Sequence, residues 1–126
     1  MGARLPTEIS EIFGARFNAR DKSALLALYT DTALLTIDGI AVARGKAEID
    51  RMITPFLEGP LKIDIRCVSC HQQGDIALVR SDWKLSEPNG AVAMAGASAE
   101  VIRKEADGLW RFIFDDDTFA SRPWAI

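Results

Sequence analysis

An Asp-Gly pair between two short apolar runs constrains the fold of this chain more than any other feature. Residues 33–37 and 40–43 are mostly apolar, and Asp38-Gly39 separates them. Both central positions of a type I′ turn need positive φ, so the stretch predicts a tight β-hairpin. Gly45 ends the second strand, and apolar residues then recur at helical spacing, at positions 49, 52, 53, 56 and 57. The sequence therefore predicts a hairpin that leads directly into an amphipathic helix.

Two further helices are expected before this hairpin. Pro6-Thr7 is typical of a helix start, and apolar residues follow at positions 9, 12, 13 and 17. Asp21 can cap a second, shorter helix that ends with Tyr29. The third helix, after the hairpin, should end near Glu58-Gly59-Pro60.

From Leu61 the hydrophobic period changes to two, which is typical of half-buried strands. Turn signals at 73–75, 87–90 and 106–108 separate strands expected over 61–67, 77–84, 91–104 and 109–117. The predicted order is α-α-β-β-α-β-β-β-β. It describes an α+β cone, in which three helices pack on one face of a curved mixed sheet. A chain of 126 residues has the size of one domain, spanning 1–126.

Three segments carry a resemblance to a known family. They are Tyr29-Thr30-Asp31-Thr32-Ala33, Arg44-Gly45-Lys46-Ala47-Glu48-Ile49 and Asp107-Gly108-Leu109-Trp110-Arg111-Phe112. In the residues of these segments and in their order along the chain, the protein resembles the SnoaL-like branch of the nuclear-transport-factor-2-like superfamily. The resemblance implies a cone fold whose sheet and helices enclose a blind cavity. It implies no single function, because the superfamily holds isomerases, dehydratases, cyclases, epoxide hydrolases and non-catalytic binding or oligomerising modules.

Charge and hydropathy exclude two classes of partner. The net charge is −3 and no block of basic residues is present, which argues against nucleic acid. No apolar run approaches the ~20 residues of a membrane span. The first residues also lack the apolar core of a signal peptide, so a cytoplasmic protein with reduced thiols is expected.

Strand alternation and the resemblance together predict an apolar pocket. Alternation places Phe112, Phe114 and Asp116 on one face of the last strand, and a row of alanines from 91 to 99 on one face of the strand before it. Tyr29 and Trp83 can each donate one hydrogen bond to a ligand. In the alternative interpretation, aromatic side chains fill the hollow and no ligand is needed. The residues expected to line the pocket are Phe13, Phe17, Tyr29, Ile37, Met52, Phe56, Val79, Ser81, Trp83, Ala97, Ala99, Phe112 and Phe114.

The resemblance also brings the catalytic pattern of steroid isomerase, which needs a carboxylate base, a tyrosine and a protonated carboxyl. In ungapped matching these groups fall on Ile37, Phe13 and Ala99 (or Ser98), so all three are absent at the matching positions. This argues against isomerase chemistry of that kind. Asp38 lies beside the base position and is interpreted as a turn residue.

Asp116 is the candidate catalytic residue. A carboxyl on the pocket face near aromatic side chains would have a raised pKa and could act as general acid or base. In the alternative interpretation, Asp115-Asp116-Asp117 is a solvated strand end.

Cys67-Val68-Ser69-Cys70-His71 matches the C-x-x-C-H pattern of c-type haem attachment. In a regular strand, however, residues 67 and 70 point to opposite faces. A zinc site is not favoured either, because the sequence holds no second pair of cysteines or histidines. No metal and no cofactor are therefore expected, and His71 is interpreted as a strand-end residue.

Two functions are consistent with the sequence. The first is a small-molecule-binding protein, or a cofactor-independent isomerase, cyclase, dehydratase or hydrolase, with a hydrophobic ligand that can be cyclic. The second is a non-catalytic dimerisation or association module. A homodimer through the exposed sheet face is expected in either case, with Met94, Ile102 and Ile113 at the contact. Trp124 is expected to cover the open end of the domain or to join a subunit contact.

Overall fold

A computed structural model describes residues 2–121 of the chain, so Trp124 lies outside the described residues. The helices are α1 (Ile9–Asn18), α2 (Lys22–Leu26) and α3 (Gly45–Glu58), with short 3-10 turns η1 (Pro6–Glu8) and η2 (Phe119–Ser121). The strands are β1 (Tyr29–Ile37), β2 (Ala41–Arg44), β3 (Lys62–Gln73), β4 (Ile76–Ser86), β5 (Val92–Lys104) and β6 (Trp110–Asp116). The predicted order of helices and strands is confirmed.

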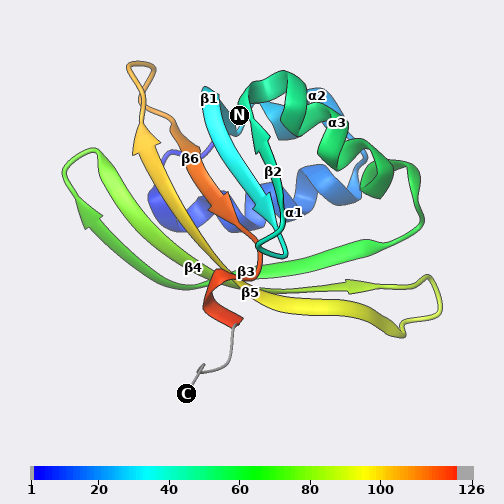
Figure 1. Ribbon diagram of the computed structural model, residues 1–126. Helices are drawn as coiled ribbons and strands as arrows, with labels where there is room; N and C mark the ends of the chain where they lie inside the picture. The colour runs from blue at the N-terminus through cyan, green and yellow to red at the C-terminus, as the bar shows by residue number, and fades with distance from the viewer. Residues whose placement is uncertain (1, 122–126) are drawn as a thin grey trace.

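The described strands form one mixed sheet in the order β2-β1-β6-β5-β4-β3. β1 and β6 are parallel neighbours, although they lie far apart along the chain, and all other pairs are antiparallel. Figure 1 shows the curved sheet with α1, α2 and α3 on one side of it. The α+β cone is confirmed. No helix within residues 2–121 is long and apolar enough to cross a membrane.

The β1–β2 hairpin has the predicted turn. Asp38 and Gly39 have φ values of 55° and 67°, as a type I′ turn requires. Before the hairpin, the Asp21 side chain caps α2 by accepting a hydrogen bond from the Ala24 amide. Tyr29 differs from the prediction, because it begins β1 opposite Phe112 of β6 rather than ending α2. Its ring is buried in the sheet-side core.

A β-bulge in the β5–β6 ladder reverses the alternation predicted for β6. Ile102 pairs with Phe112, but the next residue of β5, Val101, pairs with Phe114, so Ile113 is an extra residue. An extra residue shifts the later side chains to the opposite face. Phe114 is consequently 53% exposed, and Asp115 is buried. The prediction that Phe114 and Asp116 share the face of Phe112 is wrong.

The register of β4 and β5 corrects a second prediction. Ser98, Glu100 and Ile102 lie opposite buried residues of β4, and directly opposite residues of an antiparallel pair point to the same face. These three side chains therefore face the helices. Ala97 and Ala99 alternate with these residues along β5 and therefore face the other side of the sheet. The prediction that the alanine row lines the pocket is wrong. Ile102 belongs to the core and not to an exposed sheet face.

A second bulge, in β3, decides the arrangement of the cysteines. Cys67 pairs with Ser81 and Cys70 with Val79, and Val68 is the extra residue between them. Both thiols thus point to the inner face, where burial raises the pKa of each, and the prediction of opposite faces is wrong. His71 pairs with an exposed position of β4 and points away from both sulfurs. Across residues 2–121 no group of three or more histidine, cysteine, aspartate or glutamate side chains is placed so that it could hold a metal ion.

Candidate functional site

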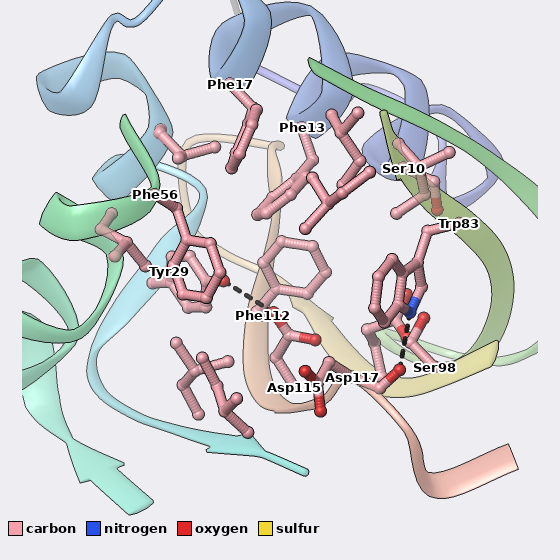
Figure 2. A pocket seen from close by; sticks show the side chains of 18 residues that line it. Ser10, Phe13, Phe17, Tyr29, Phe56, Trp83, Ser98, Phe112, Asp115 and Asp117 are labelled. Atoms are coloured by element: carbon pink, nitrogen blue, oxygen red, sulfur yellow. Dashed lines mark hydrogen bonds between the residues drawn. The ribbon is translucent and has the colours of Figure 1, made fainter. Parts of the chain in front are cut away.

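A pocket of about 100 Å³ lies between the inner face of the sheet and the helices (Figure 2). Side chains from α1, α2 and α3 and from β1, β3, β4, β5 and β6 surround it. The lining residues are Ser10, Phe13, Phe17, Leu25, Tyr29, Leu35, Ile37, Ile53, Phe56, Ile63, Ile65, Trp83, Leu85, Ser98, Glu100, Phe112, Asp115 and Asp117.

Aromatic rings form much of the apolar wall. Phe13 and Phe17 are one helical turn apart on α1, so both point to the sheet, and their ring centroids are 6.3 Å apart. Phe112 meets Phe13 edge-on at 6.1 Å and Tyr29 at 4.9 Å. Figure 2 shows Phe112 between the helix-side rings and the carboxyl group of Asp115. The pocket therefore has an aromatic side toward the helices and an acidic end on the sheet.

The structure brings together seven of the residues expected at the pocket: Phe13, Phe17, Tyr29, Ile37, Phe56, Trp83 and Phe112. Met52 packs against the core from α3 without lining the pocket. Val79 and Ser81 face inward but are buried beneath the lining residues. The remaining three, Ala97, Ala99 and Phe114, are on the other face of the sheet, for the reasons of register given above.

Two carboxyl groups form the acidic end of the pocket. Glu100 of β5 and Asp115 of β6 are directly opposite in the ladder and are 2% and 9% exposed. Such pairs have Cβ atoms about 4.5–5.5 Å apart. The Tyr29 hydroxyl donates a hydrogen bond of 2.6 Å to Asp115 Oδ2, which orients that carboxylate.

A buried hydroxyl chain holds the other carboxyl group. Ser81 Oγ donates to Glu100 Oε1 at 3.0 Å, and Ser10 Oγ of α1 is 2.6 Å from Ser81 Oγ. The second oxygen, Glu100 Oε2, is buried and has no hydrogen-bond partner among the described residues. A buried polar atom without a partner is costly in a native structure, and in a pocket it marks a position where a ligand can bond.

Burial raises the pKa of both carboxyl groups. The pKa of Glu100 rises to about 8 because of burial and the nearby charge of Asp115. The pKa of Asp115 rises to about 7, since burial outweighs the opposing hydrogen bond from Tyr29. Two carboxylates this close cannot both ionise easily in an apolar site. The pair therefore retains a proton near neutral pH, as an acid–base site requires.

A third acid joins the pocket to the hairpin. Asp117 Oδ1 accepts a hydrogen bond of 2.8 Å from the Asp38 amide, and its carbonyl accepts one of 2.7 Å from Trp83 Nε1. Burial raises the pKa of Asp117. Asp116, the expected catalytic residue, does not line the pocket, and its side chain accepts a hydrogen bond from the Thr118 amide. The bulge at Ile113 explains why Asp115, and not Asp116, points into the pocket.

The sequence reasoning missed Glu100. Its only signal was a single acid that follows a row of small residues within one strand, and its face could not be assigned without the register of β5. Asp115 was missed for a related reason, because the bulge at Ile113 is not apparent in the sequence.

Comparison with known proteins identifies the family of this chain. The chain matches the SnoaL-like domain family over residues 10–113 and belongs to it. No curated protein matches the chain significantly.

Solved structures with the same fold come from several bacteria. An NTF2-like protein with a cystatin-like fold from Novosphingobium aromaticivorans has a TM-score of 0.75 at 18% identity, covering 88% of this chain and 77% of that one. A Thiobacillus denitrificans protein assigned as a calcium/calmodulin-dependent protein kinase type II association domain has 0.74 at 22%, covering 86% and 89%. A ketosteroid isomerase-like protein from Erwinia carotovora atroseptica has 0.65 at 24%, covering 86% and 88%. At these identities the likeness establishes the fold alone.

Proposed function

We propose that this domain binds a compact, largely apolar molecule and acts on it by proton transfer without a cofactor. The observation that carries the proposal is the cross-strand pair Glu100–Asp115, two buried acids at one end of an apolar pocket. Apolar pockets with a few convergent polar groups are the usual form of a small-molecule site. Buried acids with separated roles are typical of acid–base catalysis.

The different surroundings of the two acids suit them to different tasks. Asp115 accepts the Tyr29 hydrogen bond, which favours its ionised form, so it is suited to accept a proton from the ligand. Glu100 receives a longer bond from Ser81, and its Oε2 has no partner within residues 2–121. This oxygen can therefore bond to a ligand directly, as a donor when it is protonated and as an acceptor when it is not. The pocket thus holds one phenol, that of Tyr29, and the two carboxyl groups. None of them is at Phe13, Ile37 or Ala99, the positions that match the catalytic pattern of steroid isomerase.

The pocket volume limits the ligand to a small molecule. A dry cavity of about 150 Å³ in another protein holds one benzene molecule. At about 100 Å³ this pocket is smaller, so its ligand is at most a single ring or a short branched chain, and a steroid would not fit without rearrangement.

Native mass spectrometry of freshly purified protein tests this function. We expect a discrete added mass of a small organic molecule, and we expect the Glu100→Gln/Asp115→Asn double variant to retain the fold but lose that mass. Protein that remains bare after incubation with fragment-sized ring compounds would contradict the proposal.

We also propose that the domain forms a dimer through the face of the sheet that points away from α1, α2 and α3. A dimer that binds no ligand would act as an association module. Leu34, Phe114, Val101 and Leu78 are paired in that order across four strands and form a continuous apolar row. Phe114 and Leu78 are 53% and 51% exposed. A row of this kind is typical of a protein contact. Of the residues expected there, Met94 pairs with buried Leu85 and shares its inner face, and Ile113 is the bulged residue.

Phe114→Lys is therefore expected to weaken dimerisation by at least about thirty-fold, the effect of losing one hot-spot contact. Sedimentation velocity over a concentration series measures the change. The control is Ile40→Lys, which removes an apolar side chain that is 82% exposed at the hairpin turn and away from the row. Equal dimer affinity in the two variants would place the contact elsewhere.

A further inference from the structure

The pocket has an uneven distribution of charge. Three of its lining residues, Glu100, Asp115 and Asp117, carry carboxyl groups, and no lysine, arginine or histidine is among the lining residues that the structure describes. Two of these acids are nearly inaccessible to water. A buried acid ordinarily has a positive partner or a proton, because an isolated charge in an apolar site is very costly. Among the described residues, the pocket wall supplies no positive partner.

The rest of the pocket wall favours a cationic ligand over a neutral one. Aromatic faces attract cations, with Trp and Tyr stronger than Phe, and the rings of Phe13, Tyr29 and Phe112 form a continuous set near the acids. Figure 2 shows Phe112 beside the Asp115 carboxyl group, with Trp83 across the pocket. The unpartnered Glu100 Oε2 adds an acceptor for an N–H group.

From this arrangement we infer that the ligand of the pocket is a compact organic ammonium ion. The inference rests on the proposed function, since it names the ligand class of the same site. The ammonium group bonds to Glu100 Oε2 and to the Asp115 carboxylate, and the apolar body lies among the phenylalanine rings. An anionic ligand is rejected, because a negative group would lie beside two buried acids with no positive side chain from the pocket wall to balance it.

Binding of such an ion is coupled to proton release. Without a ligand, the Glu100–Asp115 pair keeps a proton because two negative charges repel each other in an apolar site. An ammonium ion bound between the two carboxyl groups replaces that proton, which is released to the solvent. The titratable groups that face the ligand are Glu100, Asp115, Asp117 and Tyr29. The thiol of Cys67, on β3, is close to Glu100. The residues of α1, α2 and α3 that line the pocket do not titrate. Affinity should therefore increase with pH from 6 to 8.5, while an alkylamine remains protonated.

Three probes that share one five-membered ring test the inference: cyclopentylamine, cyclopentanol and cyclopentanecarboxylate. Calorimetric titration at pH 8 is expected to give at least ten-fold tighter binding of the amine than of the alcohol, because a hydrogen bond to a charged group is stronger than a neutral one. The carboxylate should not bind measurably. The amine's binding heat should depend on the ionisation enthalpy of the buffer, as proton release requires, and its affinity should increase about ten-fold between pH 6 and pH 8.5.

The matched variants are Glu100→Gln/Asp115→Asn and Asp64→Asn/Glu87→Gln. Each removes two acids, the first from the pocket and the second from the exposed surface. The first is expected to lose the preference for the amine, and the second to keep it. Equal loss in both variants would show general electrostatic attraction and would overturn the inference.

The two proposals fail in different ways. Binding of cyclopentanol as tightly as the amine would overturn the ammonium inference and leave the proposed function intact. If none of the three probes binds and the purified protein carries no added mass, both are wrong. Tight binding of the carboxylate would overturn the inference by itself.

Discussion

Glu100→Gln is expected to stabilise the folded domain at alkaline pH. Burial raises the pKa of Glu100 to about 8, so between about pH 4.5 and pH 8 the folded state holds a proton that the unfolded chain has released. The free energy of unfolding therefore falls as the pH rises through this range. Gln keeps the acceptor for Ser81 and adds no charge. At pH 8.5 the variant should be more stable by on the order of 2 kcal/mol, a rise of roughly 6–8 °C in Tm.

Thermal unfolding measured from pH 5 to pH 9 checks this result. Near pH 5 the wild type and the variant should unfold at similar temperatures, since Glu100 is then protonated in the folded state. The exposed substitution Glu87→Gln serves as the control and should leave the pH dependence unchanged. A Glu100→Gln variant with the same decline in stability as the wild type would show that the Glu100 side chain is solvated in the folded protein. Such an outcome would also remove the basis of the acid–base pair.

Local signals in the sequence predicted the helices, the hairpin and the order of the strands. Asp38-Gly39 determines its turn through backbone sterics, and Asp21 caps α2 through one side-chain hydrogen bond. Both effects depend on residues within a few positions of each other. No local signal of this kind predicts the parallel pairing of β1 with β6, because the two strands are far apart along the chain and meet only in the folded sheet.

The errors concentrate at two bulges. An extra residue at Ile113 moved Asp116 off the pocket and Asp115 onto it, and one at Val68 turned Cys70 to the same face as Cys67. A bulge depends on how a strand fits its neighbour across the sheet, so period-two counting along one strand cannot detect it. The helix-side residues Phe13, Phe17 and Phe56 were placed correctly because helical spacing has no such ambiguity.

The position of Trp83 depends on the absence of a side chain at Gly96. Gly96 lies directly opposite Trp83 in the β4–β5 ladder, and a Cβ atom there would be 2.8 Å from Trp83 Cζ2 and 3.3 Å from its Nε1. The indole is held by its hydrogen bond to the Asp117 carbonyl and is 9% exposed, so it cannot move aside easily. Gly96→Val should therefore destabilise the fold by about 2–3 kcal/mol, within the range known for overpacked cores. Tm should fall by roughly 8–12 °C.

The neighbouring substitution Ala95→Val is the matched control, because Ala95 is exposed on the same strand. It should change stability by less than about 0.5 kcal/mol. The indole N–H signal of Trp83 in a proton–nitrogen NMR spectrum reports the hydrogen bond directly, and it should shift and exchange faster with solvent in Gly96→Val alone. Because the same bond positions Asp117 at the acidic end of the pocket, the variant should also weaken ligand binding. An unshifted Trp83 signal in a Gly96→Val protein of normal stability would mean that the indole does not lie across Gly96, and the wall of the pocket on that side would have to be built differently.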